Sequence, residues 1–136
     1  MISISKSDLK KILKHGEETY NEECCGLLIG TENKVLEVRK MRNTNSGTRS
    51  RRYNIDPLEL MKVENEVDER GLEIIGIYHS HPDHPARPSQ FDLDHSFPNL
   101  SYMVLAVESG EAREITSWRR VDGDQREFAQ EKIEEK

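Results

Sequence analysis

The chain has no apolar run long enough to cross a membrane. A bilayer-spanning helix needs about 20 consecutive apolar residues, and the longest runs here, such as residues 24–30, are far shorter. The first eleven residues, MISISKSDLKK, also lack the basic start and apolar centre of a secretory signal peptide. These absences predict a cytoplasmic protein without a membrane partner.

Cysteine is also scarce. The two cysteines, Cys24 and Cys25, are adjacent, and two are too few for the disulfide framework of a small secreted scaffold. They lie in the apolar segment CCGLLIG, where free cysteine behaves as a small buried hydrophobic residue. We expect both in the core, with metal ligation or thiol reactivity as the alternative.

Basic residues are in deficit. Twenty Lys and Arg residues face 26 Asp and Glu residues, for a net charge of −6, which argues against nucleic acid as a partner because phosphate binding needs excess positive charge. One local exception contains Arg49, Arg51 and Arg52. A solvated loop is the simpler interpretation, and a contact for an acidic or carboxylate-bearing partner is the alternative.

The pattern of elements predicts an α/β fold. Apolar spacing and capping residues indicate helices at 6–20, 56–70 and 89–96. Short apolar runs bounded by turn residues indicate strands at 24–30, 34–41, 52–55, 72–78, 102–108 and 114–120. We expect a mixed sheet flanked by two or three helices, in one domain over residues 1–121. The highly charged residues 122–136 are expected to form a frayed helix or a disordered tail.

Chemistry is concentrated in HSHPDHPARPSQFDLD, residues 79–94. Residues two apart in a strand point to the same side, so His79 and His81 can present two imidazoles to one ion. Pro82 cannot donate to the sheet and ends the strand. A catalytic zinc usually takes a third protein ligand and leaves its fourth position for water.

Asp92 is the candidate for that third ligand. It follows Ser89 by three residues, so the pair is equally consistent with a simple helix-capping box. The two preceding histidines favour the ligand, because the chain returns toward the strand end after eleven residues. Other nearby residues able to bind a metal are Asp83, His84, Asp94 and His95.

Hydrolysis also needs a group that carries a proton from the zinc-activated water to the leaving amine. Glu22 and Glu23 precede one apolar strand, and Glu73 precedes another. Glu73 lies at the opposite end of its strand from the histidines, which disfavours it. The residues alone do not decide between Glu22 and Glu23.

A resemblance to a known family selects Glu23. Glu23 before CCGLLIG, then His79-Ser80-His81-Pro82, then Ser89-Gln90-Phe91-Asp92, resembles the JAMM motif of the MPN-domain metallopeptidases. Ten residues, 82–91, separate the second histidine from the aspartate, as in that motif. The resemblance spans roughly residues 5–120, and no motif position departs from the pattern.

The resemblance implies a cytidine-deaminase-like α/β sandwich with one zinc ion per chain. His79, His81 and Asp92 would hold the metal, and Glu23 would act as general acid and base. Ser89 would help to hold the water or the developing oxyanion, a role in which one lost donor costs several kcal/mol.

The resemblance also implies a substrate class. The short chain is similar to stand-alone prokaryotic members, which cleave peptide or isopeptide bonds after the C-terminal Gly-Gly of a ubiquitin-like or sulfur-carrier protein. Glycine suits a narrow groove because it has no Cβ. Arg49, Arg51 and Arg52 would then contact the partner's acidic surface or the released carboxylate.

Two alternatives remain at this point. A non-catalytic scaffold of the same fold is one, although such domains typically lose metal ligands. A nucleobase deaminase is the other, but it would need Cys-x-x-Cys and a glutamate after the first histidine, and the sequence has neither. The sequence does not predict an oligomeric state.

Overall fold

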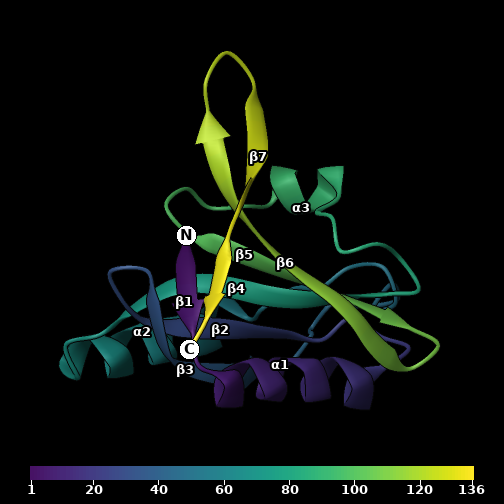
Figure 1. Ribbon diagram of the computed structural model, residues 1–136, viewed down its shortest axis with the longest axis horizontal. Coiled ribbons are helices and arrows are strands. Elements are labelled where there is room, and N and C mark those ends of the chain that lie inside the picture. The colour runs from purple at the N-terminus through teal and green to yellow at the C-terminus, as the bar shows by residue number, and fades with distance from the viewer.

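The computed structural model describes residues 1–136 as one eight-stranded mixed sheet with three helices (Figure 1). The elements in chain order are β1 (Ile2–Ile4), α1 (Lys6–Thr19), β2 (Cys25–Thr31), β3 (Lys34–Met41), α2 (Pro57–Glu69), β4 (Glu73–Pro82), α3 (Gln90–Asp94), β5 (Ser101–Glu108), β6 (Glu111–Asp122), β7 (Arg126–Glu131) and β8 (Ile133–Glu135). The strand order is β7-β6-β5-β4-β2-β3-β1-β8. The predicted mixed sheet with two or three helices is confirmed.

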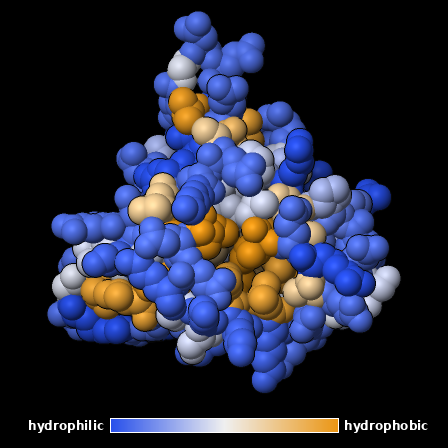
Figure 2. Space-filling view, in the orientation of Figure 1, coloured by the Kyte–Doolittle hydropathy of each residue, from blue (hydrophilic) through white to orange (hydrophobic).

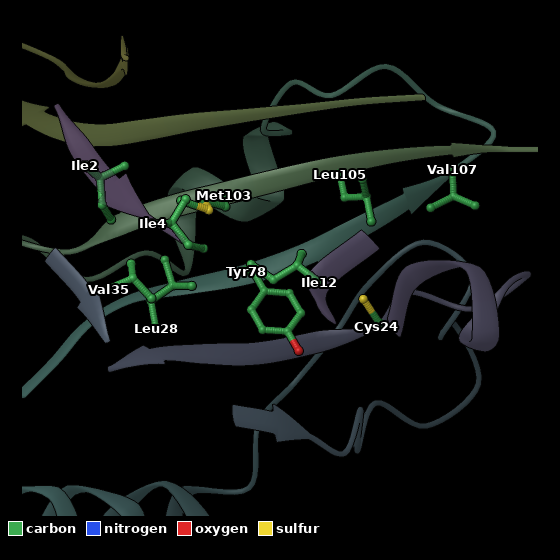
Figure 3. Close-up of a cluster of buried hydrophobic side chains, with 10 residues drawn as sticks. All are labelled: Ile2, Ile4, Ile12, Cys24, Leu28, Val35, Tyr78, Met103, Leu105 and Val107. Carbon is green, nitrogen blue, oxygen red and sulfur yellow. The ribbon is translucent and has the colours of Figure 1, made fainter. Parts of the chain in front are cut away.

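The central strands bury both of their faces. Leu28 of β2, Tyr78 of β4 and Met103 of β5 pack with Ile12 of α1 in one cluster (Figure 3). The residue before each of the three strand residues points to the opposite face, as the two-residue period of a strand requires. On that face the three preceding residues, Leu27, Ile77 and Tyr102, pack with Val63 and Val67 of α2 in a second cluster. His79 and His81 share the parity of Ile77 and therefore face away from α1.

A capping side chain stands directly before each of the two long helices. The Ser5 hydroxyl accepts the Asp8 backbone N–H at 3.0 Å, and the Asp56 carboxylate accepts the Leu58 N–H at 3.1 Å ahead of Pro57. These caps satisfy backbone donors that a helix leaves free at its start. None of the helices has the length and apolar character needed to cross a membrane.

The strand predicted at 52–55 is wrong. Residues 42–56 form a loop with no sheet pairing. Tyr53 and Ile55 pack onto the α2 face of the sheet instead. They cannot pair with the strands beneath them, because each central strand of the sheet already has a neighbour on both sides.

The frayed or disordered tail predicted for 122–136 is also wrong. Residues 126–131 form β7 beside β6, and residues 133–135 form β8 beside β1. Phe128 packs against Tyr102, with 5.5 Å between ring centroids, and Ile133 packs on the α1-side cluster. Arg126, Glu127 and Glu135 are exposed on these edge strands, where charge is usual. The Glu131 carboxylate is instead largely buried, between the Ser117 hydroxyl and the N-terminal amine.

The sheet is curled until its two ends approach each other. β7 and β8 stand at opposite ends of the strand order, although only Lys132 separates them in sequence. Figure 1 shows the chain passing from β7 down to β8 alongside β1. The Ile2 N–H donates to the Lys132 carbonyl at 3.0 Å, so one segment joins both ends of the sheet.

The β6–β7 hairpin projects from the rest of the molecule (Figure 1). Figure 2 shows that its tip is hydrophilic, whereas hydrophobic atoms gather near the centre of the same face and at the base of the hairpin. The turn residues 123–125 are all exposed. The hairpin tip therefore adds no apolar surface of its own.

Close contact between β2 and β4 depends on Gly26. This glycine stands opposite Tyr78, and a Cβ at Gly26 would collide with the Tyr78 ring. The ring cannot easily move, because it is buried and its hydroxyl is 2.7 Å from Nδ1 of His15 on α1. The absence of a side chain at Gly26 is therefore a packing requirement.

We expect Gly26→Ala to lower the free energy of unfolding by about 1–3 kcal/mol, the usual cost of overpacking a core. Urea denaturation monitored by circular dichroism measures this change. Gly123→Ala is the matched control, because a Cβ there meets nothing within 4 Å. Equal stability of the two variants would contradict the packing requirement.

Candidate functional site

Three side chains converge on one point beside the end of β4. His79 Nε2 lies 3.1 Å from His81 Nε2 and 3.1 Å from Asp92 Oδ2, and His81 Nε2 lies 3.2 Å from the same oxygen. All three residues are buried. Two imidazole nitrogens and one carboxylate oxygen are a donor set typical of a metal site.

Two local structures position these donors. His79 and His81 are successive same-side residues of β4, which lies between β2 and β5 in the centre of the sheet. Asp92 lies in the first turn of α3, where a capping box holds it: the Asp92 N–H donates to Ser89 Oγ at 3.0 Å, and the Ser89 N–H donates to Asp92 Oδ2 at 2.8 Å. The capping interpretation and the ligand interpretation of Asp92 are therefore compatible.

The spacing of the three donor atoms fits a small tetrahedral ion. Bonds of about 2.0–2.1 Å to such an ion place neighbouring ligand atoms roughly 3.3 Å apart. The observed separations of 3.1–3.2 Å are close to that value. The three donors thus form one face of a tetrahedron, and its fourth vertex is free of protein ligands.

Contacts behind the donors fix the ring orientations. His81 Nδ1 is 2.9 Å from the Pro85 carbonyl, so Nδ1–H donates there and Nε2 is the nitrogen that faces the other two donor atoms. Tyr53 stacks on His79 with 4.6 Å between ring centroids. Nδ1 of His79 is buried without a protein partner, so packing alone orients this ring.

Electrostatics keep Asp92 ionised. Burial by itself would raise its pKa, but the charge of His79 and hydrogen bonds from His79, His81 and the Ser89 N–H lower the pKa far below its ordinary value. A carboxylate that is already ionised needs no proton release before it binds a cation.

Glu23 reaches the same place from β2. Cys25 stands opposite His79, and the Ser80 N–H donates to the Cys24 carbonyl at 3.1 Å. Continuing this antiparallel register brings Glu23 opposite His81 on the same face. Glu22 lies one residue earlier and instead pairs with Arg49 at 3.0 Å. The register thus separates two glutamates that the sequence left equivalent.

The Glu23 carboxyl is buried and incompletely bonded. Only 3% of the residue is exposed, and Oε1 has no hydrogen-bond partner. Burial raises the pKa of Glu23 to about 7, although His79 and His81 act in the opposite direction. Such a carboxyl can both accept and release a proton near neutral pH.

A cavity of about 360 Å³ opens in front of these groups. Glu23, His81 and Ser89 line it together with Arg51, His84, Pro85 and Arg87. Arg87 was missed from the sequence, where its only signal was its place in the loop between His81 and Ser89. The cavity combines one of the three clustered donor residues, the buried Glu23 carboxyl and two cations.

The three arginines predicted as partner contacts lie in different surroundings. Arg49 binds Glu22 and the Asn45 carbonyl, and the Arg52 guanidinium lies 4.4 Å from the centre of the Phe91 ring. Arg51 alone of the three lines the cavity with His81 and Ser89, whereas Arg49 lines a separate cavity of about 650 Å³ that Glu23 also borders. The three arginines therefore do not form a single binding surface.

Asn43 connects this loop to the site, and it was also missed. Its side-chain amide donates to the Glu23 carbonyl at 3.0 Å and to the Arg52 carbonyl at 2.9 Å. The Glu23 N–H in turn donates to the Arg49 carbonyl at 2.7 Å. The loop and Glu23 are thus held as one unit.

The other candidate ligands lie outside the cluster. Asp83 accepts hydrogen bonds from the Tyr20 hydroxyl and the Ser109 N–H, and His95 stacks on Phe91. Asp94 accepts a bond from the Gln90 amide. Cys24 and Cys25 are free and buried, as expected for core residues. The group whose donor atoms lie close enough together to hold a metal contains only His79, His81 and Asp92.

A second cavity, of about 460 Å³, lies on the other side of Asp92. Most of its lining is apolar or aromatic, including Tyr53, Ile55, Phe91 and Tyr102. Glu23 and the histidines of the cluster do not line it. The two cavities therefore flank the cluster with opposite chemical character.

Comparison with known proteins gives consistent relatives. Over 73 residues the chain is 44% identical to a desampylase of Pyrococcus furiosus. This match covers 53% of the chain and 50% of that protein. The chain is 27% identical over 124 residues to the CysO-cysteine peptidase of Mycobacterium tuberculosis, covering 90% of this chain and 85% of the relative. A protein of Desulfitobacterium hafniense solved in solution superimposes with a TM-score of 0.83 at 28% identity, covering 100% of this chain and 93% of the other.

The family of prokaryotic homologs of the JAB domain matches residues 5–121. The match begins at the cap of α1 and ends one residue before the end of β6. It thus includes every residue of the cluster and every residue that lines the two cavities. The chain belongs to this prokaryotic JAB-domain family.

Proposed function

We propose that this protein is a zinc-dependent peptidase or isopeptidase that cleaves after the C-terminal Gly-Gly of a ubiquitin-like or sulfur-carrier protein. The observation that carries the proposal is the buried, unpartnered Glu23 carboxyl beside a complete His79–His81–Asp92 set. The relatives named desampylase and CysO-cysteine peptidase support the peptidase class and the kind of partner.

Zinc is the metal that these donors favour. It binds histidine nitrogen and carboxylate oxygen in tetrahedral sites, and catalytic sites commonly use three protein ligands. When bound, zinc would polarise the scissile carbonyl and make water a stronger acid. His79, His81 and Asp92 would hold one ion per chain, at the face that their donor atoms already form.

Glu23 has the properties of the proton carrier. In its ionised form it takes a proton from the attacking water, and in its neutral form it gives that proton to the departing amine. Both steps need a pKa near the working pH, and burial raises the pKa of Glu23 to about 7. Ser89 lines the same cavity, which allows its hydroxyl to donate to the developing oxyanion.

The depth of the site favours glycine next to the scissile bond. Glu23, His79, His81 and Asp92 are all at most 8% exposed. A substrate carbonyl has to reach these groups at the floor of the cavity, and a residue without Cβ can approach a crowded surface most closely. The apolar cavity beside Asp92 would hold residues that precede the Gly-Gly.

A non-catalytic scaffold is the less favoured alternative. A scaffold has no need for a buried carboxyl without a partner, since burying an unsatisfied polar group costs about 1–3 kcal/mol. Such a cost is usual at sites that act on a ligand. The retained Glu23 therefore supports the enzyme.

We expect Glu23→Gln to lower kcat by about 10²–10⁴-fold, the typical contribution of a general acid–base group. The assay is cleavage of a ubiquitin-like protein with residues appended after its Gly-Gly, followed by mass spectrometry. Glu22→Gln is the control, because Glu22 points to Arg49. An equal loss in the two variants, or none in Glu23→Gln, contradicts the role of Glu23.

Asp92→Asn should weaken zinc binding while the fold is retained, because the amide oxygen keeps the capping acceptor but loses the charge. The affinity should fall by more than the roughly 10–100-fold seen when only a supporting residue is lost. Competition with a chromogenic chelator measures the affinity, and circular dichroism checks the fold. Unchanged affinity would exclude Asp92 as a ligand.

The pKa of Glu23 predicts how the stability of the metal-free protein depends on pH. Glu23 has an ordinary pKa of 4.5 in the unfolded chain and about 7 in the folded protein. Between these values the folded protein keeps a proton that the unfolded chain releases, so its free energy of unfolding falls as the pH rises. The fall amounts to at most about 3 kcal/mol.

Glu23→Gln should remove this pH-dependent loss. The variant and the wild type should be similarly stable at pH 4.5, and the variant should be more stable at pH 8. Urea denaturation in the presence of a chelator gives both values. The histidines are common to the two proteins, so the difference isolates Glu23. Parallel stability curves from pH 4.5 to 8 would show that Glu23 is not buried as described.

A further inference from the structure

Arg51 and Arg87 are cations without partners at the mouth of the catalytic cavity. Six other arginines of this acidic chain form ion pairs with carboxylates. The remaining five arginines form none, and of these only Arg51 and Arg87 line the cavity that contains Glu23 and His81. In a chain with 26 acidic residues, two unpaired arginines around one cavity indicate a site for an anion.

Both arginines are carried by anchored loops. The Arg51 N–H donates to the Thr48 carbonyl at 3.0 Å, and Thr48 is held by the buried Asn45 side chain. This is the loop that Asn43 ties to Glu23. The position of Arg51 is therefore set by the same contacts that position the proton carrier.

Arg87 is anchored from the other side of the cavity. The Arg87 N–H donates to the Pro85 carbonyl at 2.8 Å, and that carbonyl also accepts from His81 Nδ1. The next residue back, Ala86, is buried, and its carbonyl accepts the Thr116 hydroxyl at 2.6 Å. The backbone that carries Arg87 is thus fixed to a metal-site histidine and to β6.

The position of Glu23 tells which end of the substrate meets the arginines. A group that gives its proton to the leaving nitrogen has to lie within hydrogen-bond reach of it. Glu23 lines two cavities, and only the one with Arg51 and Arg87 is also lined by a histidine of the cluster, His81. The leaving side of the scissile bond therefore occupies that cavity. The preceding residues occupy the apolar cavity beyond Asp92, which Glu23 does not line.

We propose that Arg51 and Arg87 bind the α-carboxylate of the residue that follows the scissile bond, so that the favoured leaving group is a single C-terminal amino acid. This inference rests on the proposed peptidase function. Guanidinium groups bind carboxylates through charge-assisted, often bidentate hydrogen bonds. A lysine side chain released from a protein conjugate carries no carboxylate close to its nitrogen and would leave both cations unpaired.

The size of the cavity agrees with a small leaving group. Its volume of about 360 Å³ is near the lower end of the range for small-molecule sites. A single amino acid fits such a space together with water. Arg51 and Arg87 are therefore specificity-determining residues for the leaving group, and not part of the proton transfer.

The test compares two peptides that differ only in one charge. Acetyl-Leu-Val-Gly-Gly-Ala is synthesised as the free acid and as the amide, and each is titrated into zinc-loaded Glu23→Gln protein, which cannot consume it. Calorimetry at low ionic strength should show at least about tenfold tighter binding of the acid, as expected for hydrogen bonds to a charged group. Equal affinity, or no measurable binding of either peptide, overturns the proposal.

Arginine variants test whether these two residues cause the preference. Adding Arg51→Gln and Arg87→Gln together should bring the acid-to-amide affinity ratio close to one. Arg126→Gln, at the start of β7 in the projecting hairpin (Figure 1), removes an equally exposed and unpaired charge away from both cavities and should keep the ratio. A ratio that survives in the double variant, or falls equally in Arg126→Gln, refutes the assignment.

The binding test is independent of the proposed reaction. The zinc-loaded Glu23→Gln protein could bind the acid more tightly than the amide while zinc-loaded wild-type protein fails to cleave the acid. That result would count against the peptidase function and leave the carboxylate site in place. Cleavage of acid and amide at equal kcat/KM would support the peptidase and overturn the carboxylate site.

Discussion

The register between β2 and β4 brings Glu23 to the cluster of His79, His81 and Asp92. Cys25 is opposite His79, so Glu23 falls opposite His81 on the same face. A slip of one residue would turn every side chain of β2 to the other face and place Glu23 in the apolar cluster under α1. Gly26 supports this register by leaving room for the Tyr78 ring. The geometry of the site therefore depends on how tightly these two strands pack.

The site places several ionisable groups where water is largely excluded. Glu23, Asp92 and the two histidines are buried within one small region, and burial of a charge is costly unless an opposite charge compensates it. Asp92 is compensated by the histidines, whereas Glu23 keeps an unpartnered oxygen. A bound cation would supply the missing compensation, which couples the stability of the fold to occupancy of the site.

Local sequence patterns predicted much of this architecture. Period and capping residues located α1 and α2, and short apolar runs located β2, β3, β4 and β5. The two-residue spacing of His79 and His81 was enough to predict that they share a face. Each of these inferences needs only residues that are close together in the chain, where the geometry of a helix or strand fixes side-chain direction.

Features that depend on distant pairing were not predictable in the same way. Glu22 and Glu23 differ only in which face of the sheet they meet, and that difference comes from pairing with β4, more than 50 residues away. Arg87 gains its place because Pro85 and Ala86 are fixed by His81 and Thr116. β7 and β8 were missed because their charged composition obscures the few apolar residues that dock them.

The joined ends of the sheet also affect the order in which the chain can fold. β1 has one registered pair with β3, at Ser3 and Lys34, but three with β8. The pairing of Ile2 with Ile133 closes almost the largest loop that the chain permits, and contacts of such long separation form late because loop closure is entropically costly. β1 can therefore complete its pairing only after β8 is in place, and the central strands that carry the histidines can assemble before the sheet is complete.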